Sequence, residues 1–127
     1  MARFNYFGFG DHFSEYHRRF EGIAGIDLDF IETCKVCSEP LAFIETAVDK
    51  GQTFKTTTTT EWIARACKKP SFLVFYTPGQ AKDEITMFRL KKLTPTKSEE
   101  VYMKPLEFIR MLLILQDKHK PFCKERK

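Results

Sequence analysis

Two short acidic stretches of the sequence are spaced so that they could form a metal site. Residues 26–33 (IDLDFIET) and 41–48 (LAFIETAV) are rich in β-branched and aromatic residues, and both contain the tetrapeptide FIET. If they form a hairpin centred on Cys37, Asp29 lies opposite Glu45. Side chains opposed in an antiparallel pair have Cβ atoms about 4.5–5.5 Å apart. We therefore expect two neighbouring carboxylates. The same register gathers an apolar surface for the core, formed by Ile26, Leu28, Phe30, Ala42, Ile44 and Val48.

These two carboxylates would suit a divalent cation. Carboxylates this close repel each other unless a proton or a cation lies between them. Oxygen ligands such as Asp29 and Glu45 are typical of Mg²⁺ or Mn²⁺ sites. The alternative is that both side chains point into solvent and are screened there.

The segment after the second stretch supplies a candidate catalytic cation. Gln52, Lys55 and Thr59 follow at the spacing of one helical face, and a helix entering here would return over the second strand. Lys55 could then neutralise the carboxylates or stabilise charge on a phosphate attacked by a metal-activated water. Gln52 would be a positioning group. A solvated lysine is the simpler reading of Lys55.

The cysteines suggest a second metal. Cys34 and Cys37 form a Cys-x-x-Cys at the predicted hairpin tip, which resembles half of a zinc site. A structural zinc ion needs four ligands. The other thiols and imidazoles occur singly, without a spacing that identifies a second pair: Cys67, Cys123, His12, His17 and His119. Zinc at this turn and a turn without metal both remain open.

Basic residues are clustered although the net charge is only +4. Clusters of this kind attract the phosphates of nucleic acid, whereas a basic tail over about 118–127 could also be a solvated terminus. The candidate nucleic-acid-binding residues are Lys68, Lys69, Lys91, Lys92, Lys120 and Lys124.

The elements that would position these residues form one domain over residues 1–127, because the chain is too short for two cores. A helix is predicted near residues 11–20, where Asp11 could cap it. A second helix contains the capping box Thr58-x-x-Glu61 and could begin anywhere from Gln52 to Thr59, because five threonines are poor helix interior but good helix entry. Strands are predicted at 71–76, apolar and central, and at 84–93, charged and edge-like.

A last helix begins at Pro105, and its apolar residues cover more than one face, which fits either deep packing or a homodimer contact. The fold class is therefore α/β. It has a mixed sheet with an N-terminal helix, a β-hairpin, a crossover helix, two further strands and a C-terminal helix. No apolar run is long enough to span a membrane, and the first residues lack the apolar core of a signal peptide, so we expect a cytoplasmic protein.

Asp29, Glu45 in FIETA, and Lys55 in GQTFK together resemble the PD-(D/E)xK nuclease superfamily, especially its small phage-type and resolvase-like members. The resemblance covers residues 26–77. It implies a restriction-endonuclease-like fold in which Asp29 and Glu45 hold Mg²⁺ or Mn²⁺ and a lysine assists hydrolysis of nucleic-acid phosphodiesters, with DNA as the expected substrate. It also implies a phage origin, activity in the host cytoplasm and a dimeric assembly.

The sequence departs from that superfamily at one position. The assisting lysine normally follows the glutamate by two residues, where this chain has Ala47. Lys55 would be a lysine that has migrated to the following helix, and Lys50 is its competitor. Ala47 also favours an alternative function, a non-catalytic interaction or regulatory protein on the same fold, with a zinc-stabilised knuckle at Cys34 and Cys37.

Overall fold

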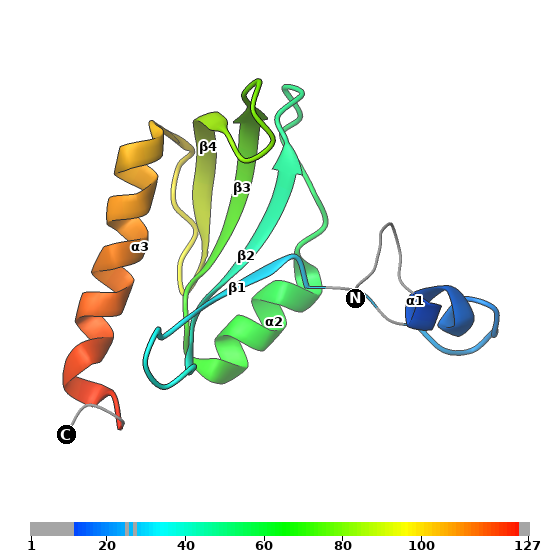
Figure 1. The fold of residues 1–127 in the computed structure, drawn as a ribbon. Coiled ribbons are helices and arrows are strands. Elements are labelled where there is room, and N and C mark those ends of the chain that lie inside the picture. Colours follow the sequence, from blue (N-terminus) through cyan, green and yellow to red (C-terminus); the bar gives the residue numbers. More distant parts are fainter. Residues whose placement is uncertain (1–11, 25, 27, 125–127) are drawn as a thin grey trace.

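The computed structural model describes residues 12–24, 26 and 28–124, and it shows an α/β fold built on one sheet (Figure 1). The elements in chain order are α1 (His12–His17), β1 (Phe30–Thr33), β2 (Pro40–Val48), α2 (Thr58–Cys67), β3 (Ser71–Pro78), β4 (Ile85–Thr94), β5 (Val101–Met103), α3 (Pro105–His119) and the 3₁₀ turn η1 (Lys120–Phe122). The predicted N-terminal helix is present over six residues. Its predicted cap, Asp11, lies outside the described residues.

The sheet is mixed and has five strands in the order β1-β2-β3-β4-β5. β2 and β3 are parallel and are joined through α2, as the crossover prediction required, while the other neighbours are antiparallel. The sequence did not predict β5, which has only three residues. β5 pairs with Phe88–Leu90 of β4. β4 is therefore not an edge strand, although its charged residues had predicted one.

The predicted hairpin register is confirmed. β1 and β2 pair Phe30 with Ile44 and continue in that register until a bulge at Thr33, which pairs with Pro40. β1 begins at Phe30 rather than at residue 26, so Asp29 lies immediately before the strand. The predicted apolar core face is therefore only partly right: Ala42 and Ile44 are buried, whereas Ile26, Phe30 and Val48 are exposed.

The core is divided between the two faces of the sheet, with α3 over one and α2 over the other (Figure 1). On the α3 side, Ala42, Ile44, Phe72, Val74, Phe88 and Leu90 pack against Phe108, Met111, Leu112 and Leu115 of the helix. A smaller cluster on the α2 side contains Leu73, Phe75, Leu93 and Ala47. Ser71 to Phe75 are all buried, which confirms β3 as a central strand.

α2 begins at Thr58, after Gln52 and Lys55, which the prediction of a catalytic lysine had placed on the helix. Its N-cap is Thr57, whose hydroxyl donates to Glu61 Oε2 at 2.6 Å, so the predicted capping box starting at Thr58 is wrong. Residues 52–57 have no regular structure, and the predicted helical face of Gln52, Lys55 and Thr59 is wrong for the same reason. Threonine side chains lose rotational freedom inside a helix. A run of threonines is therefore more favourable just before a helix or in its first turn than in its interior.

α3 begins at Pro105 as predicted, with the Glu107 carboxylate accepting a hydrogen bond from the Lys104 amide at 2.7 Å. One side of α3 packs on the sheet, whereas several apolar residues on its other side are exposed: Leu106, Ile109, Leu113 and Ile114. Among the described residues, no helix has the length and apolar character needed to cross a membrane.

Candidate active site and cysteine cluster

Asp29, Glu45 and Lys55 form one polar cluster where the β1–β2 hairpin meets the segment leading into α2. Lys55 Nζ donates hydrogen bonds to Asp29 Oδ2 and, at 2.7 Å, to the carbonyl oxygen of Thr46. It also lies 3.1 Å from Glu45 Oε1. Three oxygen atoms from three residues therefore surround a single cationic group.

The cluster is partly buried, and its hydrogen bonds fix the charge states. Glu45 is 4% exposed, and its second carboxylate oxygen accepts a hydrogen bond from the Thr60 hydroxyl. Partial burial raises the pKa of Asp29, but hydrogen bonds from Lys55 and from the Thr46 amide, at 2.9 Å, lower that pKa below its usual value. Burial lowers the pKa of Lys55, and the two carboxylates raise it above the usual value. Asp29 is thus an anion and Lys55 a cation at neutral pH.

The structure brings together three of the four residues for which the sequence suggested a catalytic role. Asp29 and Glu45 meet through the predicted register, and Lys55 reaches them from a loop instead of a helix. The competing Lys50 is exposed. Thr60 was not predicted. It faces Glu45 only because α2 begins at Thr58, and the run of five threonines left that start undefined.

Gln52 lies elsewhere, inside its own turn. Its side-chain oxygen accepts a hydrogen bond from the Lys50 amide at 2.7 Å, and its amide group donates to the Val48 carbonyl at 2.9 Å. Gln52 therefore supports the turn that follows β2.

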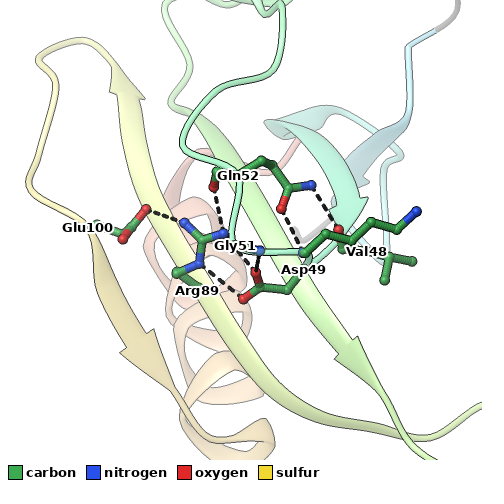
Figure 2. A network of polar contacts seen from close by, with 7 residues as sticks. Val48, Asp49, Gly51, Gln52, Arg89 and Glu100 are labelled. Atoms are coloured by element: carbon green, nitrogen blue, oxygen red, sulfur yellow. Dashed lines mark hydrogen bonds and ion pairs between the residues drawn. The ribbon is translucent and has the colours of Figure 1, made fainter.

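A buried arginine holds the same turn (Figure 2). Arg89 is 5% exposed and forms two hydrogen bonds with the Asp49 carboxylate, at 2.8 and 3.0 Å, and one with Glu100 at 2.7 Å. It also donates to the Gln52 carbonyl at 2.7 Å. Hydrogen bonds from Arg89 lower the pKa of Asp49 to about 2. This network anchors the segment that carries Lys55. It was not predicted from the sequence, although an arginine within the apolar run MFRL was a signal.

A second cluster joins the hairpin loop to the end of α3. It consists of Cys34, Cys37, His119 and Cys123, whose ligand atoms all lie within 4.8 Å of one another. Three cysteines and a histidine are the ligand chemistry of a zinc site. Cys67 is exposed on α2 and outside the cluster.

The sequence indicated only half of this cluster. The Cys-x-x-Cys pair was recognisable, but its partners lie 82 and 89 residues away along the chain. The His119-x-x-x-Cys123 spacing at the helix end was the available signal. It became specific only when packing placed that helix end beside the hairpin loop.

A basic groove lies between the carboxyl ends of α2 and α3, with a volume of about 940 Å³. Of the predicted nucleic-acid-binding residues, Lys68, Lys69 and Lys92 line it, and Arg65 and Lys118 are further basic residues in its wall. Lys91, Lys120 and Lys124 are not among its lining residues. Lys120 instead pairs with Asp117 at 3.0 Å.

Comparison of the chain with protein-family models, with curated proteins and with solved structures finds no match.

Proposed function

We propose that this protein is a metal-dependent nuclease-like domain that binds nucleic acid and hydrolyses its phosphodiesters at Asp29 and Glu45. The observation that carries the proposal is the convergence of Asp29 Oδ2, Glu45 Oε1 and the Thr46 carbonyl oxygen on one cation, the Lys55 ammonium. Anionic and carbonyl oxygens are the ligands that Mg²⁺ and Mn²⁺ prefer.

Each residue of the cluster has a role in this proposal. Asp29, Glu45 and the Thr46 carbonyl would hold the divalent cation, which supplies an activated water and polarises the phosphoryl group. Thr60 orients the Glu45 carboxylate. Lys55 carries its ammonium on a flexible four-carbon side chain, so the ammonium can move aside and stabilise negative charge on the phosphate.

This proposal keeps the resemblance to the PD-(D/E)xK superfamily and its restriction-endonuclease-like fold. Asp29 precedes one strand of a hairpin, Glu45 lies on the other strand, and a helix leads from there to a parallel strand. Lys55 replaces the lysine that is missing at Ala47. We place it in the loop before α2.

The basic groove is the proposed binding surface for the nucleic-acid backbone. α2 separates it from the carboxylates, because Thr60 in the first turn contacts Glu45 while Arg65 near the last turn lines the groove. The five-residue step from Thr60 to Arg65 rises about 7.5 Å along the helix, which corresponds to roughly two nucleotides of one strand. One strand of DNA could therefore contact the groove and reach the carboxylates.

The exposed apolar side of α3 supports the homodimer that we propose. Leu106, Ile109 and Leu113 recur at helical spacing on this side, and each is at least half exposed in the single chain. The mass of the protein in solution, measured by light scattering, tests for a second copy.

The test is a cleavage assay in which a divalent ion is added to dialysed protein. A chelator would be a poor control, because it would also attack the cysteine cluster. We expect supercoiled, single-stranded or branched DNA to be cut only when Mg²⁺ or Mn²⁺ is present. We expect Asp29→Asn and Glu45→Gln to lower the rate by at least ~100-fold, since each removes a charged ligand.

Asp83→Asn is the matched control, because Asp83 is an exposed carboxylate distant in sequence from the cluster. It should cut at the wild-type rate. Cleavage by Glu45→Gln at the wild-type rate, or no cleavage by wild-type protein on any of the substrates, would refute the enzymatic proposal.

The second candidate function is a non-catalytic interaction or regulatory protein. Ala47 and the Cys34–Cys37–His119–Cys123 cluster favour it, because a metal-stabilised scaffold can present a basic groove without any hydrolysis. In that case DNA binding would persist in Glu45→Gln and decrease steeply with salt, while no variant and no metal would produce cleavage.

A further inference from the structure

We propose that Cys34, Cys37, His119 and Cys123 bind one zinc ion, which fastens the loop of the β1–β2 hairpin to the carboxyl end of α3. The zinc site is independent of catalysis at Asp29 and Glu45.

The distances within the cluster match a tetrahedral zinc ion. Cys34 Sγ and Cys123 Sγ are 3.8 Å apart. With Zn–S bonds of about 2.3 Å, two sulfurs on a tetrahedral ion lie about 3.8 Å apart, whereas a disulfide requires about 2.05 Å. Cys37 Sγ and His119 Nε2 are 3.3 Å apart, close to the ~3.6 Å expected for a sulfur and a nitrogen on the same ion.

The hairpin loop is shaped to present thiolates. The amides of Val36 and Cys37 point at Cys34 Sγ, at 3.4 and 3.5 Å, and would stabilise negative charge there. The loop is closed by hydrogen bonds from the Cys34 amide to the Glu39 carbonyl at 2.8 Å and from the Ser38 amide to the Cys34 carbonyl at 2.9 Å.

A carboxylate lies near the second ring nitrogen of the histidine. His119 directs Nε2 at Cys37, and its Nδ1 is 3.9 Å from a Glu39 carboxylate oxygen, which is longer than a direct hydrogen bond. That carboxylate also pairs with Lys69 at 2.8 Å. A carboxylate behind the second ring nitrogen is the usual arrangement of zinc-binding histidines.

The site is closed, which assigns the ion a structural role. Cys34, Cys123 and His119 are between 2% and 7% exposed, and Leu41 and Leu115 pack around the thiols. Four protein ligands fill the tetrahedral coordination and leave no position for a substrate. The ion would join Cys34 to Cys123, which are 89 positions apart in the sequence. Gln116 also links the two segments, because its side-chain amide donates a hydrogen bond to the Thr33 carbonyl.

Metal analysis of the purified protein tests the proposal. We expect about one zinc per chain after dialysis against metal-free buffer. Loss of a residue that only hydrogen-bonds to a metal ligand lowers metal affinity by about 10–100-fold. Loss of a ligand itself, in His119→Ala or Cys123→Ser, should therefore lower zinc affinity by at least ~100-fold. Cys67→Ser is the matched control, and it should retain the zinc and the affinity of the wild type.

A second measurement avoids dependence on variants that fail to fold. Wild-type protein refolded with Co²⁺ should show the intense visible absorption of tetrahedral cobalt and a thiolate charge-transfer band, and added Zn²⁺ should abolish both. Absence of zinc from the wild type together with absence of this spectrum would overturn the proposal. So would equal loss of zinc in Cys67→Ser and Cys123→Ser.

Discussion

The carboxylate–lysine cluster and the cysteine cluster join distant segments in opposite ways. In the first, the protein supplies its own cation, since Lys55 neutralises Asp29 and Glu45 and both Lys55 and Asp29 remain about 30% exposed. In the second, the groups are three thiols and an imidazole with no cationic side chain among them, and all but Cys37 are buried. A lysine on a flexible stem can give way to another ion, whereas a buried thiol cluster gains its full set of bonds only from a metal. The first arrangement suits chemistry, and the second suits stability.

The two clusters also depend on different supports. The turn that leads into the lysine segment is held by the Arg89–Asp49–Glu100 network (Figure 2). None of these three residues belongs to the carboxylate–lysine cluster. The cysteine loop is held by its own hydrogen bonds and by Gln116 of α3, which accepts a hydrogen bond from the Lys35 amide at 3.2 Å. Changes in the Arg89 network should therefore disturb the first cluster and leave the second unaffected.

The largest expected effect comes from removing the internal cation. Lys55→Met should lower cleavage by ~100-fold or more, because the charge opposite the phosphate is lost. The same variant should be stabilised by Mg²⁺ at roughly tenfold lower concentration than the wild type, because Mg²⁺ no longer competes with an ammonium for Asp29 and Glu45. Cleavage rate and the Mg²⁺ dependence of the thermal midpoint are the two measurements.

Lys50→Met is the matched control for that experiment, since Lys50 is exposed and was the competing candidate. It should behave as the wild type in both measurements. If Lys55→Met lost activity without gaining Mg²⁺ sensitivity, Lys55 would not occupy the cation position, and the contrast between the two clusters would fail.

A smaller effect is expected from the supporting network. The folded-state pKa of Asp49, about 2, lies below its ordinary value, so its ion pair stabilises the protein above about pH 4, and that stability is lost as the pH falls towards 2. Asp49→Asn should lower the thermal midpoint at pH 7 by roughly 5 °C or more, because Arg89 keeps its burial and loses its main partner. Its unfolding free energy should also fall less steeply between pH 4 and pH 2.

Urea unfolding at a series of pH values measures this, with Asp83→Asn as the exposed control. Zinc content should remain unchanged in Asp49→Asn, whereas cleavage should decrease because the segment carrying Lys55 is less well fixed. Equal pH profiles for wild type and Asp49→Asn would show that this network does not stabilise the fold.

The parts of the molecule that the sequence predicted are those set by local alternation. The hairpin register followed from the apolar and acidic faces of two strands, and that register alone was enough to predict Asp29 beside Glu45. The start of α2 could not be predicted, because five threonines give no energetic preference for one entry point. The proximity of Cys34 and Cys123 depends on how α3 packs across the sheet, and no local pattern in the sequence indicates that contact.

The smallest expected effect concerns the backbone of the cysteine loop. Ser38 has φ of 68°, a left-handed conformation that costs an L-residue about 1–2 kcal/mol and costs glycine almost nothing. Ser38→Gly should therefore stabilise the folded protein by up to ~1 kcal/mol, after the greater chain entropy of glycine in the unfolded state is subtracted. Ser38→Ala, which keeps the Cβ and loses only the hydroxyl, is the control and should not be stabilised. Because Ser38 belongs to the cysteine loop and not to the carboxylate–lysine cluster, Ser38→Gly should leave the cleavage rate unchanged. A change in cleavage would mean that the two clusters are coupled, and the division between a reactive site and a structural site would then have to be abandoned.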